Sequence, residues 1–221
     1  LQQTVRGKPL VFLDSAASAQ KPRAVIDAMV RAMETQYANV HRGPYWLSER
    51  TTEAYEAARD AVARFLGAPA REEVVFTKST TEAINLVAYA LSNAATAKEE
   101  QFRRYAVGQG DEIVVTEMEH HANIIPWQLL RDAHGIELRV APVTDAGELD
   151  FAGLEALLSD GKVGLVAVTH MSNVLGTVVP IRRVADLAHA HGARVLFDGS
   201  QAAVHRRVDV REIGADFYVF T

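Results

Sequence analysis

The chain has 221 residues, a net charge of −5 at neutral pH and no cysteine. This length suits one large α/β domain, and the mild negative charge argues against nucleic acid as the main partner. Without cysteine, these residues can form no disulfide or cysteine zinc site, and they hold no thiol nucleophile. No apolar run reaches membrane-spanning length and no signal peptide opens the chain, so we expect a cytoplasmic protein that binds no membrane.

The first part of the chain combines small residues, two helical patterns and a polar loop. Ala16 and Ala17 lie in a run of small side chains, which let a ligand or another backbone approach closely. Pro22 predicts the start of a helix with an apolar stripe through position 33, and residues 49–66 predict a second helix. Between them, His41 and Arg42 lie in a polar loop, either as functional groups or as ordinary solvated residues.

A hydroxyl-rich turn follows the first predicted strand, residues 73–77. Ser79 and Glu82 have the spacing of a capping box, which predicts that a helix begins here. The helix N-terminus and the hydroxyls of Thr80 and Thr81 together make a suitable cradle for a phosphate group. The alternative is a well-capped helix that binds nothing, although capping alone does not require the two threonines.

The rest of the chain alternates predicted strands and helices. A polar stretch, residues 92–110, is expected to be a surface excursion with one or two helical turns. The other expected strands are 113–116, 137–142, 164–169, 195–197 and 216–221. The pattern predicts the α/β class, with three layers: a mainly parallel sheet covered by helices on both faces.

Two adjacent histidines follow the strand at 113–116. One interpretation is a metal site with Glu117 or Glu119, but adjacent histidines point in different directions and the spacing of a zinc site is absent. A second is a flat imidazole, His120, stacked on a cofactor ring and available as an acid or base near neutral pH. A third is a hydrogen-bonded structural histidine, which we assign to His121. We therefore predict no metal.

Polar residues also follow three later strands. Asp198 comes directly after a buried apolar run, and Gln201 lies three residues further on. A carboxylate at this position can pair with a ring nitrogen and hold it protonated, which makes an aromatic cofactor an electron sink. Asn173 and Thr221 end two other strands, and parallel strand ends share one edge of a sheet. This set suits pyridoxal 5′-phosphate (PLP), although the Asp198 stretch taken alone favours a simple helix cap.

Six short motifs occur in chain order: Asp14-Ser-Ala-Ala-Ser, Val40-His-Arg-Gly, Ser79-Thr-Thr-Glu-Ala-Ile-Asn, Met118-Glu-His-His-Ala-Asn, Ser172-Asn-Val-Leu-Gly-Thr and Asp198-Gly-Ser-Gln. Together they closely resemble the group II (SufS-type) cysteine desulfurases. These are PLP enzymes of fold type I in the class V aminotransferase group. The resemblance implies a large PLP-binding domain over residues 16–221, incomplete at its C-terminus, behind an N-terminal arm of residues 1–15.

The resemblance also implies roles for particular residues. Thr80, Thr81 and Thr221 would bind the phosphate, and His120 would stack on the ring and transfer protons. Asp198 would pair with the ring nitrogen, Gln201 with the ring hydroxyl, and Asn173 would lie near that hydroxyl and the substrate carboxylate. The residues implied on the substrate side are Ala16, Ala17, His41, Arg42 and Asn173.

The family's reaction takes sulfur from L-cysteine, leaves L-alanine and passes the sulfur, as an enzyme persulfide, to an acceptor protein of iron–sulfur cluster assembly. Relatives work as homodimers. Alternatives are another class V enzyme, namely a selenocysteine lyase, an epimerase or an aminotransferase, or a non-catalytic fragment.

The chain departs from the family pattern at its end. In relatives, the strand matching 216–221 runs into Gly-His-Lys, whose lysine holds the cofactor as a Schiff base. That lysine and the persulfide cysteine are absent here, and Lys78 is not proposed to replace the lysine. We expect these residues to be the N-terminal part of a longer polypeptide.

Overall fold

The computed structural model describes residues 3–221, which separate into two compact units. The N-terminal unit is Leu1–Ala63 and the C-terminal unit is Arg64–Thr221. The N-terminal unit contains a short antiparallel hairpin, formed by β1 (Thr4–Val5) and β2 (Lys8–Pro9), which the sequence did not predict.

Two long helices follow the hairpin. Helix α1 (Arg23–Thr35) begins directly after Pro22, as predicted, and none of its residues is buried. Helix α2 (Trp46–Leu66) confirms the second prediction and extends from the N-terminal unit into the C-terminal unit. It ends at Gly67, whose φ of +69° suits a residue without Cβ.

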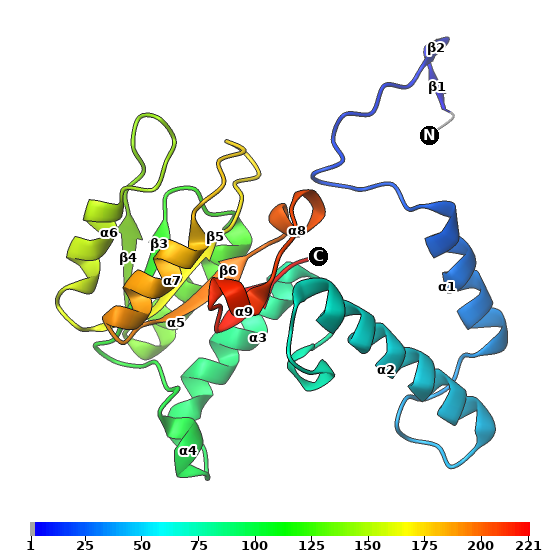
Figure 1. Ribbon diagram of the computed structural model, residues 1–221, viewed down its shortest axis with the longest axis horizontal. Coiled ribbons are helices and arrows are strands. Elements are labelled where there is room, and N and C mark those ends of the chain that lie inside the picture. The colour runs from blue at the N-terminus through cyan, green and yellow to red at the C-terminus, as the bar shows by residue number, and fades with distance from the viewer. Residues whose placement is uncertain (1–2) are drawn as a thin grey trace. The chain divides into compact units, whose positions relative to one another are not determined.

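The C-terminal unit is built on a five-stranded sheet with the order β4-β3-β5-β6-β7 (Figure 1). All four pairs of neighbouring strands are parallel. The strands are β3 (Glu112–Thr116), β4 (Glu137–Ala141), β5 (Val163–Thr169), β6 (Arg194–Asp198) and β7 (Phe217–Val219). The longer helices around them are α3 (Thr80–Asn93), α5 (Ile125–His134), α6 (Phe151–Leu158) and α7 (Ile181–Ala190).

Short helical segments complete this unit. They are η1 (Arg71–Glu73), η2 (Ala94–Thr96), α4 (Glu100–Arg103), η3 (His121–Asn123), α8 (Ala202–His205) and α9 (Val210–Ile213). The excursion predicted over residues 92–110 is largely exposed and has η2 and α4 as its helical turns, but Ser92 and Asn93 belong to α3, and Ala94 and Val107 are buried.

Helices cover both faces of the sheet, which confirms the predicted three-layer α/β architecture. Val166 and Val195 point into one core with α6 and α7, whereas Leu165 and Leu196 point into the other with α3 and α5. Successive residues of a strand face opposite sides, so strands buried on both faces read as continuous apolar runs.

One strand prediction is wrong. Residues 73–77 were expected to form a strand, but η1 occupies Arg71–Glu73 and none of residues 74–77 belongs to the described sheet. Val75 is 66% exposed and Phe76 is 43% exposed. An apolar run becomes a strand only where a neighbouring strand forms a continuous ladder with it, and none of the five strands of this sheet does so with residues 74–77. Among residues 3–221, no helix is both long and apolar enough to cross a membrane.

Candidate functional site

Asp198 ends β6 with its side chain buried, 5% exposed. Parallel register places it beside Thr169 of β5 and Val219 of β7, so three strand ends meet at this edge. Its Oδ1 accepts hydrogen bonds from Ser200 N at 3.0 Å and from Ser200 Oγ at 2.6 Å. Within residues 3–221, no donor is bonded to Oδ2. One carboxylate oxygen is therefore fixed and the other is available to a ligand.

The turn before α3 is a capped helix start, as predicted. Ser79 Oγ accepts from Glu82 N at 3.2 Å, and the Glu82 carboxylate accepts from Lys78 N. Thr80 is buried and Thr81 is exposed, both in the first turn of α3. This turn presents backbone N–H groups, the positive end of the helix dipole and hydroxyls, which together favour an anion.

Ser200 joins the helix start to the Asp198 carboxylate. Thr80 Oγ1 and Ser200 Oγ are 3.0 Å apart. Because a carboxylate only accepts, the Ser200 hydroxyl donates to Asp198, so the Thr80 hydroxyl must donate to Ser200. The two predicted halves of a PLP site, phosphate cradle and ring-nitrogen partner, are therefore one hydrogen-bonded chain.

His120 leaves β3 and caps η3. Its Nδ1 accepts from Ala122 N at 3.2 Å, so the neutral ring carries its proton on Nε2. His120 and His121 are both exposed, with ring centroids 5.9 Å apart in an edge-on arrangement. No group of three or more His, Cys, Asp or Glu side chains in the described chain is arranged to hold a metal ion.

Glu119, directly before His120, is a carboxylate that the sequence offered only as a possible metal ligand. Its Oε1 accepts from Thr116 Oγ1 at 2.6 Å and Thr169 N at 3.0 Å, and its Oε2 accepts from Asn123 Nδ2 at 2.7 Å. Burial raises the pKa of Glu119 to about 7; the three hydrogen bonds oppose this shift and the charge of Asp198 adds to it. Glu119 and Asp198 therefore interact electrostatically.

A histidine–tyrosine pair lies next to Asp198. His170 Nδ1 and the Tyr218 hydroxyl are 3.0 Å apart. Burial, with Arg206 nearby, lowers the pKa of His170 to about 4, and burial together with Asp198 raises the pKa of Tyr218. Both side chains are therefore neutral near pH 7. A Cβ at Gly199 would lie 2.2 Å from the Tyr218 ring, so only glycine fits between Asp198 and Ser200.

Three other predicted residues lie at the same strand ends. Asn173 is exposed in the turn after β5, Gln201 is half-buried at the start of α8, and Thr221 is exposed just after β7. This edge thus carries all the predicted cofactor residues. Ser200 was not singled out from the sequence, although its position between Asp198 and Gln201 was a usable signal.

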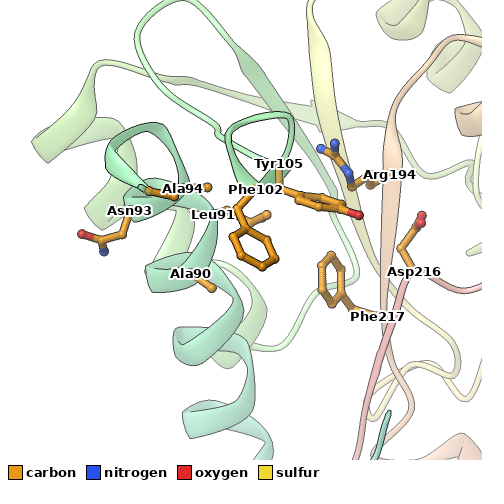
Figure 2. Close-up of a pocket in the computed structure, with 10 residues that line it drawn as sticks. Ala90, Leu91, Asn93, Ala94, Phe102, Tyr105, Arg194, Asp216 and Phe217 are labelled. Atoms are coloured by element: carbon orange, nitrogen blue, oxygen red, sulfur yellow. The ribbon is translucent and has the colours of Figure 1, made fainter. Parts of the chain in front are cut away.

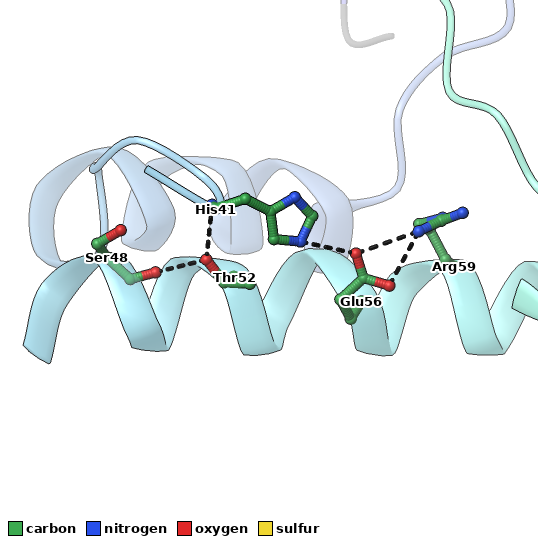
Figure 3. A network of polar contacts seen from close by, with 5 residues as sticks. All are labelled: His41, Ser48, Thr52, Glu56 and Arg59. Carbon is green, nitrogen blue, oxygen red and sulfur yellow. Dashed lines mark hydrogen bonds and ion pairs between the residues drawn. The ribbon is translucent and has the colours of Figure 1, made fainter. Parts of the chain in front are cut away.

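The predicted substrate-side residues other than Asn173 belong to the N-terminal unit. His41 has a φ of +59°, donates its backbone N–H to Thr52 Oγ1 at 3.0 Å, and places Nε2 3.0 Å from Glu56 Oε1. Glu56 also pairs with Arg59, so His41 is held along α2 (Figure 3). Arg42, Ala16 and Ala17 are exposed.

A cavity of about 630 Å³ lies at the opposite edge of the sheet. Arg194, the first residue of β6, and Asp216, just before β7, line it with the rings of Phe102, Tyr105 and Phe217 (Figure 2). It contains none of the predicted site residues. In parallel sheets, ligands bind at the carboxyl ends of the strands, so the Asp198 edge remains the candidate site.

Comparison with known proteins identifies the family of the chain. The sequence model of the class-V aminotransferase family matches residues 11–221. The chain belongs to this family. Its match to a cysteine desulfurase of Dickeya dadantii is 53% identical over all 221 residues and covers 51% of that protein. The chain thus spans about half the length of the curated relatives it matches.

Two solved structures share the fold. The apo structure of a cysteine desulfurase from Thermococcus onnurineus NA1 matches 94% of the chain with a TM-score of 0.83 and 37% identity, over 48% of its own length. The cysteine desulfurase CsdA from Escherichia coli matches 95% of the chain with a TM-score of 0.78 and 37% identity, over 49% of its own length. Both similarities confirm the expected fold of this family.

Proposed function

We propose that the chain is part of a PLP-dependent cysteine desulfurase of the SufS type. Such an enzyme converts L-cysteine to L-alanine and passes the sulfur, as a persulfide, to an acceptor protein of iron–sulfur assembly. The observation that carries this proposal is the chain from Thr80 through Ser200 to Asp198. It connects an anion cradle to a buried carboxylate that has one oxygen available.

The residues at this edge fit PLP. Asp198 Oδ2 is available to a protonated ring nitrogen. The first turn of α3 offers the backbone N–H groups of Thr80 and Thr81 and the Thr81 hydroxyl to a phosphate, and Thr221 would add a further hydroxyl. Bound PLP supplies an electron sink for the carbanion that forms at the substrate Cα. The part of Asp198 is to hold the ring nitrogen protonated, which a neutral side chain cannot do.

The other residues at the edge orient and transfer protons. His120, with its proton on Nε2 and Nδ1 held by Ala122, would stack on the ring and exchange a proton with the substrate. Gln201 would bond the ring hydroxyl, and Asn173 would lie near that hydroxyl and the substrate carboxylate. His121, which is not assigned to the cofactor, would be structural.

The remaining parts of the proposal concern the N-terminal unit and the assembly. Ala16, Ala17, His41 and Arg42 would line the substrate side. Residues 16–221 would form a single PLP-binding domain behind an arm of residues 1–15, in a homodimer. The chain shares about 50% sequence identity with proteins named as cysteine desulfurases, which supports desulfurase activity over the other activities of class V.

The test is turnover by the intact protein loaded with PLP. We expect L-cysteine to yield alanine and, with a thiol reductant, sulfide in equal amounts, and Asp198→Asn to lose both while it retains PLP. Binding of PLP without release of alanine from L-cysteine would contradict the proposal. Selenide release from L-selenocysteine alone would favour a selenocysteine lyase instead.

A further inference from the structure

Glu119 connects three segments around the turn that carries His120. Its donors are Thr116 at the end of β3, Thr169 at the end of β5, and Asn123 in η3. Thr116 Oγ1 also accepts from Met118 N at 3.1 Å. A single carboxylate thus fixes the exit of β3 against β5.

The orientation of the His120 ring depends on the same turn. Ala122 N donates to His120 Nδ1, and Asn123 N donates to His120 O at 2.8 Å. Ala122 and Asn123 are buried, so these donors have fixed positions. Whatever holds Asn123 therefore holds the ring.

The hydrogen bonds around Glu119 have only one consistent direction. Trp127 Nε1, which can only donate, bonds to Asn123 Oδ1 at 3.1 Å. Asn123 must therefore present Nδ2 to Glu119, and position 119 must accept. In either orientation, an amide at position 119 would turn its own N–H donors toward another donor, because all three neighbours donate to this side chain.

We propose that Glu119 is a positioning residue, whose carboxylate joins the ends of β3 and β5 and thereby fixes the tautomer and orientation of the His120 ring. The inference rests on the proposed function, because it assigns His120 to the PLP site. It goes further in explaining why a half-buried carboxylate without a place in the chemistry lies beside that site.

Four variants of the intact protein test this: Glu119→Gln, Asn123→Asp, the double variant, and Glu117→Gln. Glu117 is a matched control, since it is an exposed carboxylate on the same turn, and its Oε2 accepts from Val143 N at 3.0 Å. The double variant exchanges amide and carboxylate at unchanged net charge. The amide at 119 can then donate to the carboxylate at 123, which still accepts from Trp127.

The main readout needs no PLP. Long-range ¹H–¹⁵N NMR spectra of cofactor-free protein with ¹⁵N-labelled histidine report which ring nitrogen of His120 carries the proton. The His120 signals are identified by their absence from the spectrum of His120→Ala. We expect Glu119→Gln to shift His120 from the Nε2–H tautomer toward a mixture, the double variant to restore it, and Glu117→Gln to leave it unchanged. In PLP-loaded protein, circular dichroism of the cofactor should follow the same order, and kcat should fall about 10-fold or more in Glu119→Gln with little change in KM.

Two outcomes would overturn the proposal: a folded Glu119→Gln protein with the wild-type tautomer of His120, or a double variant no closer to wild type than Glu119→Gln. If Glu119→Gln does not fold, the double variant decides, since the proposal requires it to fold with the wild-type tautomer. The tautomer depends on neither PLP nor L-cysteine, so its result is distinct from failure of the proposed function.

Discussion

Two carboxylates at the same edge of the sheet contrast in their surroundings. Asp198, at the end of β6, has one oxygen held by Ser200 and the other available. Glu119, after β3, has both oxygens bonded to donors from three segments. The difference indicates their roles: the unsatisfied carboxylate can bind a ligand, whereas the satisfied one holds its neighbours in place.

The largest expected effect comes from removing the charge of the available carboxylate. Asp198→Asn keeps the shape and the bond to Ser200 but cannot hold a ring nitrogen protonated, so turnover of L-cysteine should fall at least about 10²-fold. PLP binding should persist through the phosphate cradle. Steady-state kinetics and the absorbance of the bound cofactor check both, and near-normal turnover would show that Asp198 is wrongly assigned.

The second prediction concerns the packing of the turn that joins Asp198 to Ser200. Gly199→Ala places a Cβ 2.2 Å from the Tyr218 ring, so the Asp198–Ser200 turn must shift and the free energy of unfolding should fall by about 1–3 kcal/mol. Gly164→Ala is the control, since its Cβ would meet Val107 at an ordinary 3.7 Å. Equal denaturation midpoints for the two variants would refute the close approach.

The surroundings of Glu119 should make the free energy of unfolding depend on pH. Because the folded pKa, about 7, lies above the unfolded value of 4.5, the stability that Glu119 contributes is complete below pH 4.5 and is lost as the pH rises through 7. As the pH rises from 4.5 to above 7, the free energy of unfolding of the wild type should fall by up to about 3 kcal/mol relative to that of Glu119→Gln. Urea denaturation at several pH values measures this, and parallel curves would contradict it.

His170 has the opposite effect on the pH dependence of stability, and this effect cancels when the wild type is compared with Glu119→Gln. Its folded pKa, about 4, lies below the unfolded 6.5, so its contribution is present above pH 6.5 and is lost as the pH falls through 4. Both proteins keep His170, so the difference between them reports on Glu119.

The smallest effect is expected at the second histidine. His121→Ala should leave the spectrum of bound PLP almost unchanged, whereas His120→Ala should shift it and reduce turnover, because stacking and proton transfer are lost. Visible absorbance of the two purified variants is sufficient, and the reverse pattern would assign the wrong histidine to the ring.

Much of this edge could be predicted because parallel strands bring their ends together regardless of sequence separation. The apolar runs before Thr169 and Asp198 identified the strands, and Ser79 with Glu82 identified the start of α3. Local chemistry was enough for these features, since each depends on residues within a few positions of one another.

Other features depend on contacts that the sequence does not display. The bond between Thr80 and Ser200 joins residues 120 positions apart, and the bond between Glu119 and Thr169 joins residues 50 apart. The predicted strand at 73–77 failed for a related reason, because pairing requires a neighbour that local pattern cannot supply.

The proposed role of Asp198 is to hold the ring nitrogen of bound PLP in its protonated form. The ¹⁵N resonance of PLP labelled at that nitrogen, bound to the intact protein, tests it most directly. We expect a protonated nitrogen in the wild type from pH 6 to about 9 and an unprotonated one in Asp198→Asn. The same resonance in both proteins, or an unprotonated nitrogen in the wild type, would contradict it.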